Sequence, residues 1–251
     1  MIQRLCLCAG LLLAAFNGNA QGAPPSFKVL ALLSPVEDHR QMMKAARPML
    51  EEMARENHFQ ISITDDASVL NAANLRQYAV VVQLQEAPFD IPVAAQQALQ
   101  QYIESGKGWV GIHAAGLTGK SFLAPGTPYW QWFEGFMGGV IYWPHPAFQK
   151  GTVIVEDHTH PITKGLPAKF EISDEWYEFD KSPRGQVRVL ATADETTYHP
   201  NKPMGDHPII WVNEKFRRMV YIGIGHDASL CSDPNFTLLL KNAINWAAEQ
   251  Q

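Results

Sequence analysis

The strongest constraint on the fold of this chain is a pair of apolar strands on either side of a helix. The segment "YAVVVQL", from residue 78, is apolar over the length of a strand, and "WVGI", from residue 109, is a second such run. Between them, Pro92 stands at the start of a helical pattern and Gly106 just past its end, the usual placement of these residues. Strands without alternation are buried on both faces, as in a parallel sheet covered by helices. The N-terminal half therefore predicts a doubly wound α/β fold.

The remaining segments extend this pattern. "FKVLALL" and "FQISITD" are of strand length, and residues 40–57 have helical spacing, in which Pro48 either kinks the helix or marks its first turn. In the second half, "GTVIVED", "KFEIS", "VRVLATAD", "PIIWVNE" and "RMVYIGIG" predict short strands added to the sheet in antiparallel fashion. Asp233 as N-cap and Pro234 after it begin a final helix. Without a linker between the halves, we expect one domain over residues 26–251.

Residues 1–23 have the layout of a secretory signal peptide. Arg4 precedes an apolar run at residues 5–16, and small residues follow near Ala20. The apolar run is too short to span a bilayer comfortably, so no stable membrane insertion is expected. The sequence thus predicts a cleaved leader and a periplasmic or secreted protein.

Charge content argues against a nucleic-acid partner, and cysteine content argues against an internal disulfide. The 251 residues have a formal net charge of -5 and a pI near 6.0, which gives no general attraction to polyanions. Nucleic acid is therefore not an expected partner. Cys6 and Cys8 fall within the leader, so the mature chain retains only Cys231 and forms no internal disulfide.

Three histidines follow predicted strands at the point where each strand ends. His113 comes directly after "WVGI", His39 lies in the loop "SPVEDHR" after the first strand, and His226 with Asp227 follows the last strand. In open parallel sheets, ligands bind at the carboxyl ends of the strands. Each histidine alone is as often a structural imidazole as a functional one. Together they predict one crevice that contains all three.

Two adjacent carboxylates, Asp174 and Glu175, follow another strand. They suit metal binding or general acid–base chemistry, although adjacent carboxylates are also common on solvated loops. If the crevice binds a divalent ion, His39, His113 and His226 are the expected ligands, and imidazole with carboxylate suits Zn or Mn. No nucleotide cofactor is expected.

At His113 the chain is expected to bend sharply from the strand into a helix, and this bend is called the elbow. An aromatic segment, "YWQWFEGFMGGVIYWPH", follows the elbow helix. Aromatic faces stack on sugar rings, but such residues more often belong to the core or to a contact between subunits, and a homo-oligomer is left open. Trp130 and Trp143 are the candidates for facing a ligand. His39, His145, Tyr177 and Asp227 complete the residues expected to bind substrate.

The order of several motifs resembles that of the ThuA-like (trehalose utilisation) family. "SGKGWVGIHAAG", "GGVIYWPHP", "VEDHTHPITKGLP", "ISDEWYEF", "HPIIWV" and "RMVYIGIGHD" follow one another over essentially the whole mature chain. The resemblance implies a flavodoxin-like fold related to class I glutamine amidotransferases, with His113 at the elbow where those enzymes carry a catalytic cysteine. The family usually has a glycine before "RMVY", where this chain has Arg217.

The histidine at the elbow excludes amidotransferase chemistry. An acyl-enzyme needs a thiolate there, and Cys231 lies in another element. The resemblance implies work on sugars or on their oxidised keto forms. A 3-keto sugar has an acidified α-proton, so a base and an electrophile allow isomerisation or elimination. His113, His226, Glu175 and Asp174 are the expected catalytic residues.

Two hypotheses follow for the function. The first is an exported carbohydrate-active enzyme of hydrolase, lyase or isomerase type, acting on small glycosides or their 3-keto derivatives. The alternative is a non-catalytic sugar-binding or accessory protein on the same fold. Histidines and acids clustered at strand ends favour the enzyme.

Overall fold

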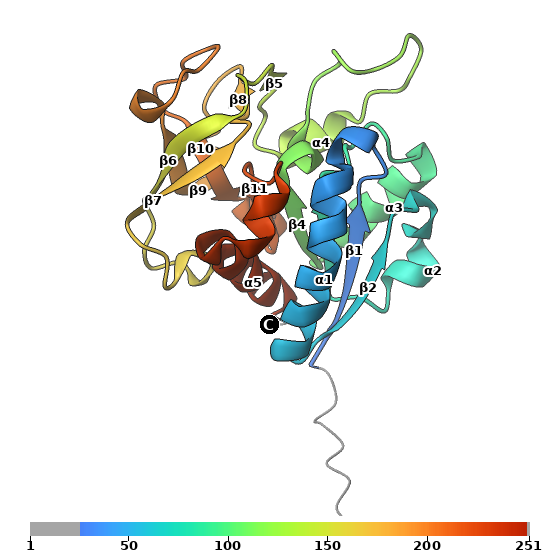
Figure 1. Ribbon diagram of the computed structural model, residues 1–251. Helices are drawn as coiled ribbons and strands as arrows, with labels where there is room; N and C mark the ends of the chain where they lie inside the picture. Colours follow the sequence, from blue (N-terminus) through green and yellow to red (C-terminus); the bar gives the residue numbers. More distant parts are fainter. Residues whose placement is uncertain (1–25, 250–251) are drawn as a thin grey trace, which may run out of the picture.

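The computed structural model describes residues 26–249, so the predicted signal peptide lies outside the described residues (Figure 1). The core is a nine-stranded sheet in the order β2-β1-β3-β4-β11-β10-β9-β6-β7. Its strands are β1 (Lys28–Leu33), β2 (Gln60–Thr64), β3 (Val80–Leu84), β4 (Gly108–Ile112), β6 (Gln149–Val155), β7 (Lys169–Asp174), β9 (Arg188–Asp194), β10 (Pro208–Val212) and β11 (Met219–Ile222). A separate two-stranded sheet pairs β5 (Tyr142–Trp143) with β8 (Glu178–Phe179).

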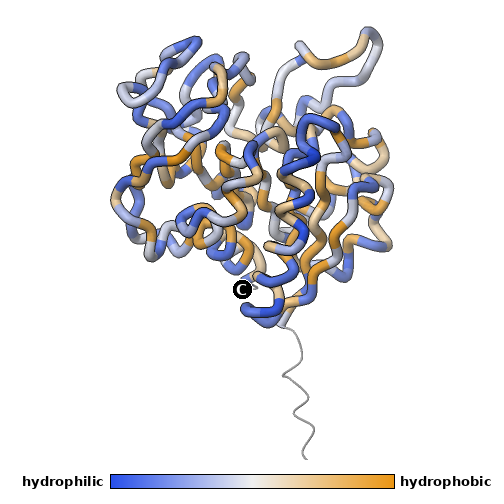
Figure 2. Tube along the Cα trace, in the orientation of Figure 1, coloured by the Kyte–Doolittle hydropathy of each residue, from blue (hydrophilic) through white to orange (hydrophobic). Residues whose placement is uncertain are grey.

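The parallel part of the sheet, with helices on both faces, is the predicted doubly wound structure. Strands β2, β1, β3, β4 and β11 pair in parallel, and their apolar residues form the centre of the molecule (Figure 2). One face of the sheet packs against α1 (Arg40–Glu56) and α5 (Pro234–Ala248). The other face packs against α2 (Ala72–Leu75), α3 (Val93–Glu104) and α4 (Gln131–Phe136). None of the helices within residues 26–249 is long and apolar enough to cross a membrane.

The helix ends follow from the local sequence. The side chain of Asp233 accepts hydrogen bonds from the N–H groups of Asn235 and Phe236, which confirms it as the N-cap of α5. Helix α3 begins directly after Pro92, as predicted. Helix α1 runs through Pro48 without ending, so that proline lies inside the helix and not in its first turn.

Two expectations need correction, one about the last strand and one about the segment after β4. Strand β11 is antiparallel to β10 but parallel to β4, so it is a central strand of the sheet and not an antiparallel addition. The predicted helix after the elbow is only a single 3-10 turn, His113–Gly116. The other short strands, β6, β7, β9 and β10, pair in antiparallel fashion as expected.

The turn before β11 keeps its shape without a glycine. Arg217 has a φ of 56°, in the left-handed region that glycine occupies most easily. Arg217 therefore stands where the family usually has a glycine, and the chain still turns into β11 at this position.

Candidate functional site

His113 lies at a strained elbow directly after β4. It is buried, and its φ of 54° is unusual for a residue with a side chain. Its Nδ1 atom lies 3.0 Å from the carbonyl oxygen of Gly223, which follows β11. Because a carbonyl only accepts, Nδ1 carries the proton and donates this hydrogen bond. When the ring is neutral, Nε2 is therefore the nitrogen without a proton, and it faces Glu175.

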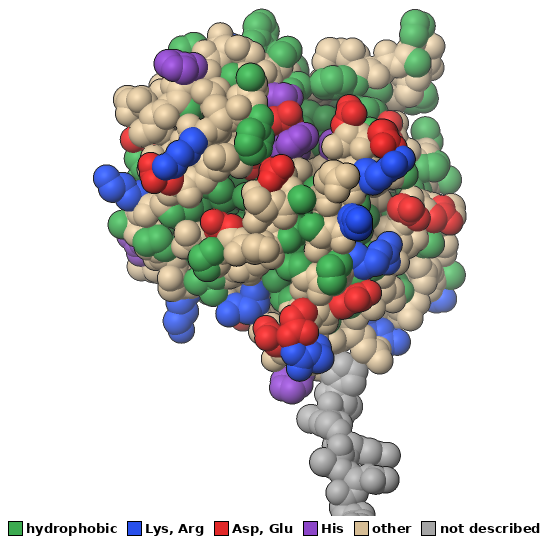
Figure 3. Space-filling model, viewed as in Figure 1, with side chains coloured by type: hydrophobic (Ala, Val, Ile, Leu, Met, Phe, Trp, Pro, Cys, Tyr) green, Lys and Arg blue, Asp and Glu red, His purple; other side chains and the backbone are tan. Residues whose placement is uncertain are grey.

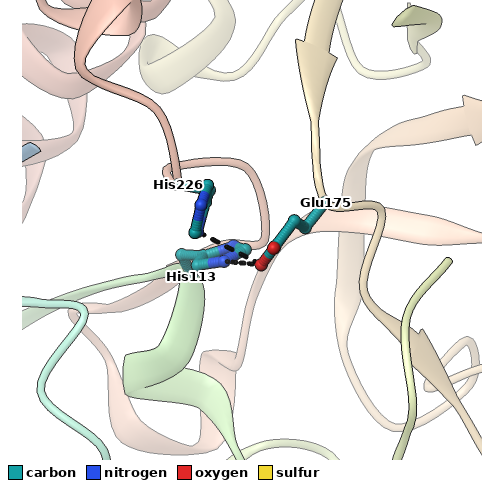
Figure 4. Close-up of side chains that lie close together, drawn as sticks. All are labelled: His113, Glu175 and His226. Carbon is teal, nitrogen blue, oxygen red and sulfur yellow. Dashed lines mark hydrogen bonds and ion pairs between the residues drawn. The ribbon is translucent and has the colours of Figure 1, made fainter. Parts of the chain in front are cut away.

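Glu175 brings the histidines together through one oxygen atom. Its Oε2 lies 3.4 Å from Nε2 of His113, 3.1 Å from Nδ1 of His226 and 3.4 Å from Nε2 of His145. Figure 4 shows that the first two imidazoles converge on this carboxylate from different loops. Burial disfavours the charged carboxylate, but the three histidines outweigh this effect and lower the pKa of Glu175.

Two of the three histidine nitrogens near this oxygen have no proton to donate to it when their rings are neutral. Nδ1 of His145 lies 2.8 Å from the carbonyl oxygen of Pro146, so it carries the proton and leaves Nε2 bare when the ring is neutral. His113 is in the same state. Two nitrogen lone pairs therefore point at a carboxylate oxygen that is itself an acceptor. This arrangement is favourable only when protons or a cation lie between them.

The same atoms fit a metal ion. Nδ1 of His226 is buried and makes no hydrogen bond, because its 3.1 Å approach to Glu175 is poorly aligned for one. Ligand atoms of His113, Glu175 and His226 lie within 4.8 Å of one another. Two imidazole nitrogens and a carboxylate oxygen are the ligands that zinc and manganese accept. These three residues would hold such an ion.

Asp174 holds the loops of the site in place. It ends β7, is fully buried, and accepts hydrogen bonds from the backbone N–H groups of Gly225 at 2.7 Å, Glu175 at 2.7 Å and His226 at 3.2 Å. Burial raises the pKa of Asp174, while His113 and these N–H groups oppose that shift. With its oxygens occupied by backbone donors, Asp174 positions its neighbours.

His39 and Tyr177 border the cluster. The ring of His39 lies 6.2 Å from that of His226, and burial together with the nearby histidines lowers the pKa of His39 to about 4. The ring of Tyr177 lies 3.9 Å from that of His113 and stacks on His145 at 5.4 Å. In the space-filling view, histidine and acidic side chains lie together beneath the notch at the top of the molecule (Figure 3). The three strand-end histidines thus reach one place.

Three other predicted residues have side-chain contacts that do not involve Glu175. Trp130 packs against other aromatic side chains, and its indole N–H donates to Gln100. Asp227 caps the turn that follows it. Trp143 is 47% exposed, with the ammonium of Lys202 4.9 Å from its ring centre. The structure gives Trp130 and Asp227 local structural contacts and leaves Trp143 open to solvent.

Sequence reasoning missed a group of buried polar residues beside the histidines. Gln85 directly follows β3 with a φ of 56°, and its amide donates to the carbonyl of His226 at 3.1 Å and to that of Gly225. Glu86 and Ser34 are buried beside it at the ends of β3 and β1. The rule that selected His113 also applies to Ser34 and Glu86, because both come after the carboxyl end of an apolar strand.

A cavity of about 700 Å³ lies away from the histidines, at the opposite ends of the strands. Its lining includes Arg188 and Arg218. Arg188 pairs with Asp157 and Glu214, and Arg218 with Glu249. These two cations are already paired; Lys107, Arg217 and His160, a histidine outside the cluster, also line the cavity.

Comparison with known proteins agrees with this fold. A family model described as trehalose utilisation (ThuA) matches residues 28–247. Among solved structures, a ThuA-like protein from Bacteroides uniformis is 33% identical, with a TM-score of 0.79 over 90% of this chain and 93% of that one. A ThuA-like protein from Parabacteroides merdae is 19% identical, with a TM-score of 0.66 over 90% of each chain. A search of curated proteins finds no match.

A more distant likeness extends to the amidotransferases. A GMP synthase protein from Thermoplasma acidophilum is 14% identical, with a TM-score of 0.56 over 88% of this chain and 94% of that one, which shows a shared fold alone. The family's description connects the protein with carbohydrate metabolism. The chain belongs to the ThuA (trehalose utilisation) family.

Proposed function

We propose that this protein is an exported carbohydrate-active enzyme that acts on small glycosides or their 3-keto derivatives by proton transfer. One observation carries the proposal: the ring nitrogens of His113, His145 and His226 converge on one carboxylate oxygen of Glu175. Such a set of coupled acids and bases in a crevice is typical of active sites. A purely structural cluster does not need so many titratable groups around one oxygen.

The reacting bond follows from the chemistry of a keto sugar. A carbonyl acidifies the C–H bond on the neighbouring carbon, so a bare imidazole nitrogen can remove that proton. His145 suits this step, because its Nδ1–H is held by the carbonyl of Pro146 and its side chain is 28% exposed at the edge of the cluster. Glu175 stabilises the imidazolium that forms. In an isomerisation the imidazolium returns the proton to the former carbonyl carbon, while the proton of the α-hydroxyl passes to the former carbonyl oxygen. In an elimination the glycosidic oxygen leaves from the β-carbon, a double bond forms between the α- and β-carbons, and the imidazolium gives its proton to the leaving oxygen.

The remaining residues prepare the site for this step. Glu175, His113 and His226 would hold a divalent ion, which supplies Lewis-acid stabilisation of the sugar's carbonyl oxygen when bound. Tyr177 covers the rings of His113 and His145 and excludes water from that side. Burial raises the pKa of Tyr177 well above its usual value, so its phenol stays neutral.

The first test is turnover by the purified mature protein. Glycosides and their 3-keto derivatives are incubated with protein that has been treated with chelator or loaded with Zn or Mn, and loss of substrate is followed. We expect turnover of a keto glycoside that chelator abolishes. Binding without turnover by the metal-loaded protein would contradict the proposal and favour a sugar-binding accessory protein.

Variants connect the activity to the cluster. His113→Ala and His226→Ala are expected to abolish turnover and to melt within a few degrees of the wild type. His158→Ala is the matched control, because His158 is exposed and the residues that follow it, Thr159 and His160, line the cavity that lies away from the cluster. Full activity of His113→Ala would exclude this site.

A further inference from the structure

A buried histidine outside the cluster, His207, contacts the backbone of Tyr177. It directly precedes β10 and is 1% exposed. Its Nε2 atom lies 2.9 Å from the carbonyl oxygen of Tyr177, and its Nδ1 atom lies 3.0 Å from Oε1 of Glu195 and 2.8 Å from the hydroxyl oxygen of Tyr198. The ring of Tyr177 in turn lies 3.9 Å from that of His113. A continuous series of contacts therefore runs from Glu195 through His207 and Tyr177 to the site.

The partners of the two ring nitrogens indicate the charge of His207. A carbonyl oxygen only accepts, so Nε2 carries a proton and donates it to Tyr177. A carboxylate also only accepts, so the 3.0 Å approach of Glu195 is favourable when Nδ1 carries a proton as well. A neutral ring would direct the lone pair of Nδ1 at a carboxylate oxygen inside the protein, where such a contact is costly. The ring with both protons is an imidazolium.

Glu195 and Tyr198 make different demands on Nδ1. Burial disfavours the charge of Glu195, but hydrogen bonds from His207 and from two backbone N–H groups lower its pKa to about 2, so it is ionised at neutral pH. Burial raises the pKa of Tyr198, so its phenol is neutral. A neutral hydroxyl can either donate or accept, whereas an ionised carboxylate needs a donor. Glu195 therefore decides the state of Nδ1.

Further carboxyl groups lie near His207. Glu178 is buried, and Asp206 directly precedes His207 in the chain. Burial raises the pKa of Glu178 and the hydrogen bond from Arg184 lowers that of Asp206, and His207 lies near enough to both carboxyls to lower their pKa values as well. Arg184, a cation of the same region, already pairs with Asp206 and Glu156. Carboxyl groups on several sides favour the charged form of a buried imidazole.

We propose that His207 is a buried imidazolium that acts as a positioning residue for Tyr177. Glu195 anchors the cation, because two backbone N–H groups hold its oxygens at 2.7 and 2.9 Å. His207 holds the backbone of Tyr177 from behind, while the ring of Tyr177 covers His113 and stacks on His145 at 5.4 Å. The use of this ring to exclude water from a sugar rests on the proposed function, whereas the charge and the contact do not.

The charge is measured by ¹⁵N NMR at pH 7.5, above the ordinary imidazole pKa of about 6.5. Long-range ¹H–¹⁵N spectra of the labelled mature protein show which ring nitrogens carry protons, and His207→Gln assigns the signals. We expect both ring nitrogens of His207 to be protonated in the wild type. In Glu195→Gln the new amide can donate to Nδ1, so His207 should become neutral and keep its proton on Nε2.

The position of Tyr177 is measured in the same spectra. Its ring displaces the ¹H shifts of the ring protons of His113 and His145, and Tyr177→Leu gives the size of this effect. We expect His207→Leu to lose most of it, because nothing then donates to the carbonyl of Tyr177. Glu195→Gln should retain it, since Nε2–H is still present.

Tyr198→Phe is the matched control, because it removes the other group at Nδ1 and leaves Glu195 in place. It should retain both the imidazolium and the ring shifts. A neutral His207 in the wild type, or a folded His207→Leu variant with unchanged ring shifts, would overturn the proposal. If His207→Leu does not fold, an imidazolium that persists in Glu195→Gln would overturn it instead. Absence of turnover on keto sugars would overturn only the proposed function.

Discussion

The carboxylate of Asp174 accepts a 2.7 Å hydrogen bond from the backbone N–H of Gly225. Asp174 ends the edge strand β7, whereas Gly225 follows the central strand β11, and β10, β9 and β6 lie between these strands in the sheet. The antiparallel half of the sheet must therefore curl back over the strand ends. This contact places Glu175, the next residue, beside His113.

Asp174→Asn is expected to weaken the contact between the end of β7 and the loop after β11. An amide keeps one acceptor oxygen and directs its NH₂ group at a backbone donor, so at least one buried N–H loses its partner. We expect a loss of about 3 kcal/mol in the free energy of unfolding, measured by urea denaturation. Glu171→Gln, on the exposed side of the same strand, should stay within about 0.5 kcal/mol of the wild type. Equal stability of the two variants would contradict the role given to Asp174.

Gly225→Ala is expected to displace the elbow. An added Cβ would lie 2.4 Å from Cγ2 of Ile112 and 3.1 Å from Cβ of His113. Such overpacking costs about 1–3 kcal/mol and shifts the backbone that carries His113, so turnover should fall at least tenfold. Gly135→Ala is the control, because nothing lies within 4 Å of a Cβ there. Wild-type turnover by Gly225→Ala would show that the close approach has no functional importance.

Acid should destabilise the protein through Glu195. Burial disfavours its charge, but hydrogen bonds from His207 and from the N–H groups of Met204 and Gly205 outweigh it and lower the pKa of Glu195 to about 2. Because the folded pKa lies below the unfolded value of 4.5, this stabilisation is complete above pH 4.5 and is lost as the pH falls towards 2. Allowing for solvent screening, it amounts to about 2 kcal/mol.

Urea denaturation of Glu195→Gln checks this sign. The variant should be less stable than the wild type at pH 6 and should approach it at pH 2.5. A constant difference over that range would rule out ionisation of Glu195 as the cause.

Glu86 should show the opposite dependence. Burial, supported by Asp90, raises the pKa of Glu86 to about 7 from an ordinary value of 4.5. The folded pKa lies above the unfolded one, so stability is highest below pH 4.5 and falls as the pH rises through 7. Glu86→Gln should therefore be more stable than the wild type at pH 8.5, by about 3 kcal/mol at most, with a smaller difference at pH 4. Thermal melts at both pH values decide this, and a less stable variant at pH 8.5 would contradict it.

The sequence was most informative where local pattern and global fold agree. Continuous apolar runs predicted β3 and β4, and capping residues such as Asp233 and Pro92 predicted the starts of α5 and α3. The rule that ligand sites lie at strand ends selected His113 and its partners before any contact was known. These features depend on residues close together in the chain.

Features that depend on strand pairing escaped prediction. A single sequence does not show that β11 pairs in parallel with β4, or that β7 curls back to bring Asp174 to Gly225. Glu86 was missed because one carboxyl between two apolar segments is ordinary until its burial is seen. The sequence did not show how Trp130 packs, because one aromatic residue among several has no pattern that separates contacts with Trp132 and Phe133 from contact with a ligand.

The central claim is that the site around Glu175, with His145 as its base, moves a proton on a keto sugar, and exchange in D₂O tests it most directly. The mature protein, loaded with Zn or Mn, is incubated with a 3-keto glycoside, and replacement of the proton next to the carbonyl is followed by ¹H NMR. We expect exchange well above the uncatalysed rate. Glu175→Gln and His226→Ala should reduce it at least a hundredfold while remaining folded, and His158→Ala should leave it unchanged. Exchange at the uncatalysed rate by the metal-loaded wild type, or equal exchange by Glu175→Gln and the wild type, would contradict the account.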